Sequence, residues 1–432
     1  MDRAILHSDM NCFYASVEML HHPEFAGRPL AVGGDPEARH GIILTANYPA
    51  KRCGVKTGMA LWQARQACPE VVLVPPRMDL YLRFSRLAHQ IYAEYTDLQE
   101  PFGIDESWLD VTGCASAAGD AGEIAARIRS RVKKELGLTV SIGVSWNKIF
   151  AKFGSDYKKP DAVTEITREN YRDIIWRAPA SDLLYVGRAT AKKLRTLGLN
   201  TIGDVAVCEP RILTAHLGKM GLILWTFANG EDQTPVAAET FESPIKSIGN
   251  STTTPRDLED NEDVRMVICL LAESVASRLR DNHFVGRNIG ISVRDDGLSW
   301  FSRQQMIEVP TNISDEITRY AMQIFLQHYD WKHPIRSVGV RVAELQPDEY
   351  CYQTSMFMDE RQREKQLQID RTVDFLRGRF GHDSILRCRM YYDRALSGLD
   401  AKADDHCVHP HGYFEKGVHV FGEAQEQAGT TG

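Results

Sequence analysis

The stretch FGIDESWLDV (residues 102–111) combines alternating apolar residues with two adjacent acids, Asp105 and Glu106. Such alternation predicts a strand with one buried face. Near the start of the chain, AILHS (residues 4–8) also reads as a strand, and it leads directly into Asp9. Neighbouring strands lie about 4.8 Å apart, so these carboxylates can meet on one sheet although they are distant in sequence. The alternative is that Asp105 and Glu106 only form a turn.

The segments around this stretch predict a β-α-β-β-α-β unit. A helix over 79–96 precedes residues 102–111, and a basic helix over 123–136 leads to the strand LTVSIGV (138–144). Together with the first strand, this is the order of a ferredoxin-like fold. Short strand-like runs and a helical stretch between 13 and 77 form a small mixed lobe that interrupts it. We therefore predict an α+β fold.

The chain changes character beyond Pro160. Residues 169–232 are helical and basic, whereas residues 233–244 contain prolines and lack periodicity, which indicates a linker. A second β-α-β-β-α-β unit follows over 245–345. Its predicted strands and helices, in chain order, are 246–253, 264–280, 287–294, 300–307, 314–328 and 336–345. The remaining tail, 346–432, is polar, with one predicted helix over 360–380 and a poorly ordered end.

Length and composition exclude several classes of protein. A chain of 432 residues is too long for one ordinary core, so several domains are expected. No stretch approaches the roughly 18 apolar residues of a membrane span, and no export signal is visible. The nine cysteines are scattered and never spaced as CxxC, which argues against a disulfide framework or a structural zinc site. We expect a cytoplasmic protein.

The overall charge of −7 counts against a nucleic-acid partner, but the average hides two basic stretches. Residues 127–159 hold nine Lys or Arg against two acids, and residues 183–220 hold six against two. These are the places where a phosphate backbone could lie. The alternative is that they are solvated helix faces.

The three carboxylates suggest a metal chemistry. Hard divalent cations need oxygen ligands, and Mg²⁺ typically takes one or two carboxylates together with substrate phosphates. Two ions about 3.5 to 4 Å apart can hold the attacking and leaving oxygens of a phosphoryl displacement. Asp9, Asp105 and Glu106 are therefore the candidate catalytic and metal-binding residues.

Five blocks of sequence carry a resemblance to a known family. They are DMNCFYASVE (9–18), LTANYPAKRCGV (44–55), FGIDESWLDVTG (102–113), SIGVSWNKIFAKFGSDYKKP (141–160) and VGRATAKKL (186–194). In order and spacing they resemble the Y-family translesion DNA polymerases, nearest the bacterial DNA polymerase IV branch. The resemblance covers residues 1–345 and extends more weakly into the tail.

The resemblance implies a right-hand polymerase with a ferredoxin-like palm, small fingers, a helix-hairpin-helix thumb and a βαββαβ little finger. The implied ranges are palm 1–12 and 78–168, fingers 13–77, thumb 169–232, linker 233–244, little finger 245–345 and C-terminal tail 346–432. The implied activity is low-fidelity, template-directed addition of deoxynucleotides to a primer 3′ end by a monomer using two Mg²⁺ ions, without proofreading.

Two other functions are weighed against this one. A catalytically inactive scaffold could keep the polymerase fold to bind the sliding clamp and DNA, but the retained Asp9, Asp105 and Glu106 speak against it. A nucleotide cyclase on a related palm leaves the thumb, the linker and the little finger unexplained.

The resemblance also assigns roles near the acids. It implies that the Met10 carbonyl joins the metal ligands and that Tyr14 is a steric gate beneath the incoming sugar, although core packing is the commoner role of such a residue. The implied nucleotide-binding residues are Cys12, Phe13, Tyr14, Thr45, Tyr48, Lys51 and Lys159. Many relatives have Arg then Lys after YPA, whereas this chain has Lys51 then Arg52, which leaves open which of them contacts the triphosphate.

Further assignments concern DNA and a clamp. In the thumb, Gly187, Arg188 and Lys192 are implied to contact DNA, because a hairpin glycine lets backbone amides approach a phosphate. In the little finger the candidate DNA-binding residues are Arg287, Arg294, Arg303 and Arg341, which could face template phosphates. In the tail, Gln353, Met356 and Phe357 keep the anchors of a sliding-clamp peptide, although Thr354 replaces its usual leucine.

Overall fold

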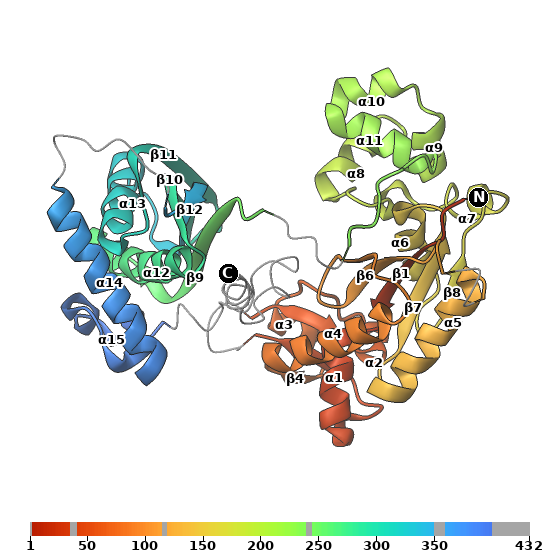
Figure 1. The fold of residues 1–432 in the computed structure, drawn as a ribbon, viewed down its shortest axis with the longest axis horizontal. Helices are drawn as coiled ribbons and strands as arrows, with labels where there is room; N and C mark the ends of the chain where they lie inside the picture. Colours follow the sequence, from red (N-terminus) through yellow and green to blue (C-terminus); the bar gives the residue numbers. More distant parts are fainter. Residues whose placement is uncertain (1, 35–40, 115–118, 239–243, 350–358, 400–432) are drawn as a thin grey trace, which may run out of the picture. The chain divides into compact units, whose positions relative to one another are not determined.

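A computed structural model describes residues 2–34, 41–114, 119–238, 244–349 and 359–399 of the chain. These residues form two compact units (Figure 1). The first unit contains the described residues from 2 to 238, apart from those around position 41, and the second contains those from 244 to 399. Among the helices of the described ranges, none is long and apolar enough to cross a membrane.

The first unit is built on a five-stranded sheet in the order β5-β6-β1-β7-β8. Its strands are β1 (Ile5–Met10), β5 (Gln99–Pro101), β6 (Glu106–Asp110), β7 (Val140–Ser145) and β8 (Val163–Glu165). The first four in this order confirm the predicted ferredoxin-like arrangement. The three-residue strand β8 extends the sheet and was not predicted.

Helices cover both faces of this sheet. On one face, α4 (Met78–Ala93) and α5 (Ala121–Arg131) pack against fully buried residues such as Leu6, Leu109 and Ile142. Burial of each such side chain contributes about 1.5 to 3 kcal/mol. On the other face, α6 (Lys148–Tyr157) packs against β1 and β7. Residues 5, 7 and 9 of β1 alternate toward α6, so Asp9 and α6 share a face.

The small lobe has its own sheet and core. Strands β2 (Leu30–Gly33), β3 (Ile43–Ala46) and β4 (Val72–Val74) form a sheet in the order β3-β2-β4. Its helices are α1 (Phe13–His21), α2 (Tyr48–Arg52) and α3 (Leu61–Ala67). Helix α1 follows β1 after a single tight turn, in which Cys12 adopts a left-handed conformation with φ 48°. The turn therefore places the start of α1 next to Asp9.

A helical subdomain completes the first unit. Its helices are α7 (Tyr171–Ile174), α8 (Arg188–Thr196), α9 (Ile202–Val207), α10 (Pro210–Leu217) and α11 (Lys219–Ala228). Their apolar faces share one cluster with Trp146 and Phe150 at the start of α6. The Trp146 indole also donates a 2.9 Å hydrogen bond to the carbonyl of Gly230. The helical subdomain is thus anchored on the sheet domain.

The second unit repeats the β-α-β-β-α-β order with a different strand arrangement. Its antiparallel sheet runs β11-β10-β12-β9, and both long helices pack on one face of it. The elements are β9 (Ser247–Leu258), α12 (Asn261–Asp281), β10 (Phe284–Asp295), β11 (Trp300–Thr311), α13 (Ser314–His328) and β12 (Ile335–Pro347). All six predicted segments are confirmed. The last strand in the sequence, β12, lies inside the sheet between β9 and β10.

Part of the predicted tail belongs to this second unit. The predicted helix over 360–380 is present as α14 (Glu360–Phe380), and a short helix α15 (Arg394–Ser397) follows it. Met390 and Leu396 join the same hydrophobic cluster as the helices of the unit. Residues 359–399 are therefore packed structure, whereas the sequence predicted a tail from 346 onward.

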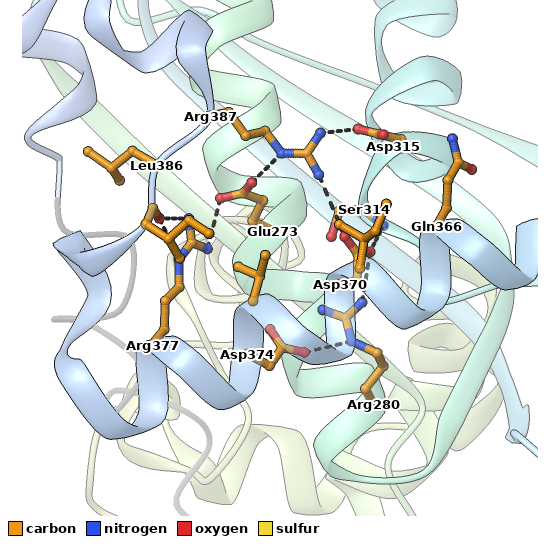
Figure 2. A pocket seen from close by; sticks show the side chains of 13 residues that line it. Glu273, Arg280, Ser314, Asp315, Gln366, Asp370, Asp374, Arg377, Leu386 and Arg387 are labelled. Atoms are coloured by element: carbon orange, nitrogen blue, oxygen red, sulfur yellow. Dashed lines mark hydrogen bonds and ion pairs between the residues drawn. The ribbon is translucent and has the colours of Figure 1, made fainter.

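Buried ion pairs fasten α14 to α12 and α13 around a cavity of about 250 Å³ (Figure 2). Arg280 lies 2.7 Å from Asp374, and Arg377 lies 3.0 Å from Glu273. Arg387, beyond the helix, contacts Glu273 as well. Removing one partner of such a buried pair costs about 3 to 5 kcal/mol, because the other charge is left unpaired. The packing of residues 359–399 thus depends on charge as well as on apolar contact.

Candidate active site

Strand pairing brings the predicted acids together. Asp9 of β1 pairs directly with Glu106 of β6, and side chains of directly paired residues point to the same side of a sheet. The amide of Met10 donates a 2.9 Å hydrogen bond to the carbonyl of Asp105, which precedes β6. Asp9, Asp105 and Glu106 therefore lie at one end of the sheet, as the sequence predicted.

Two lysines enter this acid cluster, Lys152 from within α6 and Lys159 from the loop after it. The Lys152 ammonium lies 2.9 Å from Glu106 and 3.5 Å from Asp9. The Lys159 ammonium lies 2.7 Å from the same oxygen of Asp9. Both lysines also contact Asp156, at 3.2 and 2.8 Å. The sequence interpretation assigned Lys159 to the triphosphate and did not identify Lys152 or Asp156.

The proximity of these groups shifts their acidity. Burial, followed by repulsion from Asp9 and Glu106, raises the pKa of Asp105 to about 7. Burial raises the pKa of Asp9 to about 6, although the charge of Lys159 opposes the rise. Burial would also raise the pKa of Glu106, but the nearby ring of His7 and the charge of Lys152 outweigh it, so this pKa falls well below its usual range. The cluster is electrostatically uneven, because Asp105 and Asp9 hold their protons more tightly than usual whereas Glu106 stays ionised.

The donor set suits a hard cation. In the described ranges, no group of three His, Cys, Asp or Glu residues forms a ready-made metal cage, since the lysine ammonium groups lie among the carboxylates. The four carboxylates of the cluster nevertheless outnumber its two lysines. A divalent cation at oxygen ligands would offset both the burial and the repulsion that raise the pKa of Asp105. The residues present therefore fit a magnesium site.

His7 lies next to Glu106, and the sequence analysis did not identify it as a site residue. Its fully buried ring has Nδ1 2.8 Å from the Ser155 hydroxyl and Nε2 3.5 Å from Glu106. Burial lowers the pKa of His7 to about 4, so the ring is neutral. Nothing in the sequence distinguished this histidine from a packed core residue, because its contacts with Ser155 and Glu106 arise only in the folded sheet.

The predicted nucleotide-binding residues lie around the start of α1 and α2. Phe13 is buried and Tyr14 is half-buried, both in the first turn of α1. In the described part of the chain the buried hydroxyl of Tyr48 makes no hydrogen bond. Burial raises the pKa of this hydroxyl, and the nearby Cys12 thiol raises it further. The ammonium of Lys51 lies over the Tyr48 ring at 5.3 Å. Thr45 is half-buried in β3.

Most of the basic stretch 127–159 is paired with acids. Arg131 contacts Glu94 at 2.6 Å, and Lys133 contacts Asp161 at 2.7 Å. Lys152 and Lys159 are likewise paired with carboxylates of the acid cluster. The stretch is therefore mostly occupied by internal ion pairs rather than offered to a phosphate backbone. In the helical subdomain, by contrast, Gly187 caps α8, and Arg188 and Lys192 are exposed.

The four candidate arginines of the second unit do not share one face. Arg341 pairs with Gly290, and Arg294 is four residues further along β10, so both lie on the face without helices. Arg303 pairs with the buried Ile291 and therefore lies on the helix-covered face, at the sheet edge. Arg287 lies where the pairing of β10 with β11 shifts register, between Gly286 and Asn288. The residues Gln353, Met356 and Phe357 fall outside the described ranges.

Comparisons with known proteins identify the relatives of this chain. The family model "impB/mucB/samB family" matches residues 8–156, and its C-terminal domain model matches residues 245–356. The chain is 50% identical to DNA polymerase IV of Acetivibrio thermocellus, over 92% of this chain and 100% of that protein. It is 37% identical to DNA polymerase IV 1 of Bacillus subtilis, over 88% of this chain and 91% of that protein.

A solved structure shows the same fold. The chain superposes on a Y-family DNA polymerase chimera of Dbh and Dpo4 with a TM-score of 0.69 and 25% identity, covering 79% of this chain and 98% of the chimera. The matched models, the relatives at full length and this structure all identify one group of enzymes. The chain belongs to the DNA polymerase IV group of the Y-family translesion DNA polymerases.

Proposed function

We propose that this polymerase extends a primer through two Mg²⁺ ions held by Asp9, Asp105, Glu106 and the carbonyl of Met10. The observation that supports this best is the backbone pairing that gathers the three carboxylates, where burial and then mutual repulsion raise the pKa of Asp105. The ions would supply charge stabilisation for the attacking and leaving oxygens of nucleotidyl transfer. Low fidelity and the absence of proofreading accompany the family.

The lysines of the cluster have distinct proposed tasks. Lys152 lies between Asp9 and Glu106 and keeps both carboxylates ionised. Lys159 is held at Asp9 by one short ion pair and belongs to a loop after α6, so it can exchange this carboxylate for the triphosphate. Charge donors at the β- and γ-phosphates stabilise the departing pyrophosphate. Both lysines thus compensate negative charge in the site.

The nucleotide is proposed to lie over the start of α1. The first amides of a helix lack intrahelical partners, and no side chain caps those of α1. The Tyr48 hydroxyl offers a further donor, because it is buried without a hydrogen bond in the described ranges. Cys12, Phe13, Thr45 and Lys51 complete the proposed nucleotide site. Tyr14 is the proposed steric gate.

DNA is proposed to contact both units. In the thumb, the amides at the start of α8 and the exposed Arg188 and Lys192 suit a phosphate. In the little finger, Arg341 pairs with Gly249 and Gly290 on the two neighbouring strands. Because these glycines have no side chains, a phosphate can approach the sheet beside Arg341. Arg294 lies on the same face. Arg303 is a weaker candidate because it lies on the helix-covered face, and Arg287 is weaker because it lies at a register shift that leaves its face unassigned.

The further assignments rest on the sequence. The palm, fingers, thumb, linker and little finger are proposed to have the ranges given above, with 359–399 added to the little finger. Gln353, Met356 and Phe357 are proposed to bind the sliding clamp, and the residues that flank this peptide, in β12 and α14, both belong to the second unit.

Primer extension tests the catalytic assignment. With Mg²⁺ and the four deoxynucleotides, the wild type is expected to extend a primed template, and Asp105→Ala is expected to lose activity by orders of magnitude while still binding DNA. Asp97→Ala, an exposed acid of the same domain, is the matched control and is expected to stay active. An inactive wild type would favour the scaffold that binds clamp and DNA. Tyr14→Ala is expected to accept ribonucleotides more readily, and unchanged sugar discrimination would remove the gate assignment.

A further inference from the structure

A buried carboxylate lies one helical turn beyond the proposed steric gate. The Glu18 side chain on α1 is only 3% exposed. Arg77 donates to both of its oxygens, with Nε 3.0 Å from Oε1 and Nη2 2.5 Å from Oε2. The Tyr81 hydroxyl donates to Oε1 at 2.6 Å. Arg77 and Tyr81 belong to the start of α4, which packs beside α1 (Figure 1).

Tyr81 connects this carboxylate to the gate. Its ring is fully buried and stacks on the Tyr14 ring, with centroids 4.4 Å apart and an interplanar angle of 12°. Burial, together with the hydrogen bond to Glu18, raises the pKa of Tyr81, so its hydroxyl stays protonated and remains a donor. The orientation of the Tyr81 ring is thus fixed at its far end by Glu18.

We propose that Glu18 and Arg77 are positioning residues for sugar selection, which set the Tyr14 ring through Tyr81. This inference rests on the proposed gate. A ring that rejects a single hydroxyl must be held to within about 0.5 Å, and such tolerance comes from locked supporting side chains. The bidentate pair between Glu18 and Arg77 removes rotation of the carboxylate, and the carboxylate in turn holds Tyr81.

The test compares deoxyribonucleotide with ribonucleotide insertion by the full chain. For wild type, Tyr81→Phe, Arg77→Gln and Glu18→Gln, kcat/KM is measured with dATP and with ATP opposite template thymine. The ratio of the two values is expected to fall about three- to tenfold in each variant, the factor that one hydrogen bond represents. Insertion of dATP is expected to change less. Arg77→Lys, which keeps the charge and loses the fork, is expected to restore part of the ratio.

A control and a mild variant separate this effect from a general loss of stability. Arg131→Gln removes a bidentate contact with Glu94 in the same unit and is expected to leave the ratio unchanged. Thermal unfolding reports whether each variant folds. Should Glu18→Gln fail to fold, Tyr81→Phe decides, because it removes one hydroxyl and keeps the stacked ring.

Combination with Tyr14→Ala distinguishes the two ways in which the inference can fail. If Tyr14→Ala lowers the ratio and Tyr81→Phe lowers it no further in that background, the buried pair acts through Tyr14. If Tyr14→Ala lowers the ratio but Tyr81→Phe and Arg77→Gln alone leave it at the wild-type value, the positioning role is overturned and the gate remains. If Tyr14→Ala leaves the ratio unchanged, the gate itself is wrong and the inference is overturned with it.

Discussion

Replacement of Asp105 by asparagine is expected to stabilise the first unit while removing activity. The folded-state pKa of Asp105 is about 7, against an ordinary 3.8, so between those values the folded protein holds a proton that the unfolded chain releases. Asp105 therefore lowers the free energy of unfolding progressively as the pH rises from about 4 to 7. Asparagine has nearly the same shape and no charge, so the penalty disappears at neutral pH.

The magnitude follows from the shift. About three pKa units correspond to about 4 kcal/mol as an upper limit, at 1.36 kcal/mol for each unit. Repulsion from Asp9 and Glu106 is only part of the shift of Asp105, and neighbouring carboxylates titrate together, so about 2 kcal/mol is a reasonable gain for one substitution. For a unit of this size, about 2 kcal/mol raises Tm by about 4 to 8 °C.

Thermal unfolding at pH 5 and pH 8, without divalent cations, measures this gain. Asp105→Asn is expected to exceed the wild type at pH 8 by a margin that narrows at pH 5. Addition of Mg²⁺ is expected to raise the Tm of the wild type at pH 8 and to leave the variant nearly unchanged. Asp97→Asn is the control for loss of an exposed acid. An Asp105→Asn gain of the same size at both pH values would refute the reasoning.

Three other perturbations give separate tests. Lys152→Met leaves two carboxylates without one of their ammonium partners. We expect kcat to fall at least tenfold and the acidic limb of the pH–rate profile to shift to higher pH, as measured by single-turnover primer extension. Arg377→Gln leaves the buried Glu273 short of a partner; we expect about 3 kcal/mol of destabilisation confined to the unfolding transition of the second unit, seen by calorimetry. Arg341→Ala is expected to lower DNA affinity and the slope of its salt dependence by about one, whereas Arg303→Ala leaves both nearly unchanged in a fluorescence titration.

The sequence predicted the order of elements well, because alternation and helical spacing are local signals. Residues 102–111 and the six segments of the little finger illustrate this. The three-residue strand β8 carries too little pattern to be recognised alone. The docking of α14 was not predicted either, because its buried surface includes Arg363 and Arg377, and such charges read as solvent-exposed until their partners on α12 and α13 are known.

In the candidate site, the predicted strand ends identified the acids. The groups that shift the pKa values of these acids could be recognised only from the folded structure. Lys152 contacts Glu106 because α6 lies on the same face of the sheet as Asp9, and His7 contacts it because β1 pairs with β6. The direction of Arg303 depends on strand register, and Arg287 lies where the pairing of β10 with β11 shifts register. A single residue of register reverses the face of a side chain, so sequence alone could not separate these arginines from Arg341.

The ammonium groups among the carboxylates are expected to keep this polymerase folded when no metal ion is bound. Small zinc domains collapse when a chelator removes their ion, because nothing else balances their ligands. Here Lys152 and Lys159 already offset part of the negative charge around Asp9. On the metal assignment proposed above, depletion of magnesium is expected to silence synthesis without unravelling the palm, and resupply is expected to restart it without refolding.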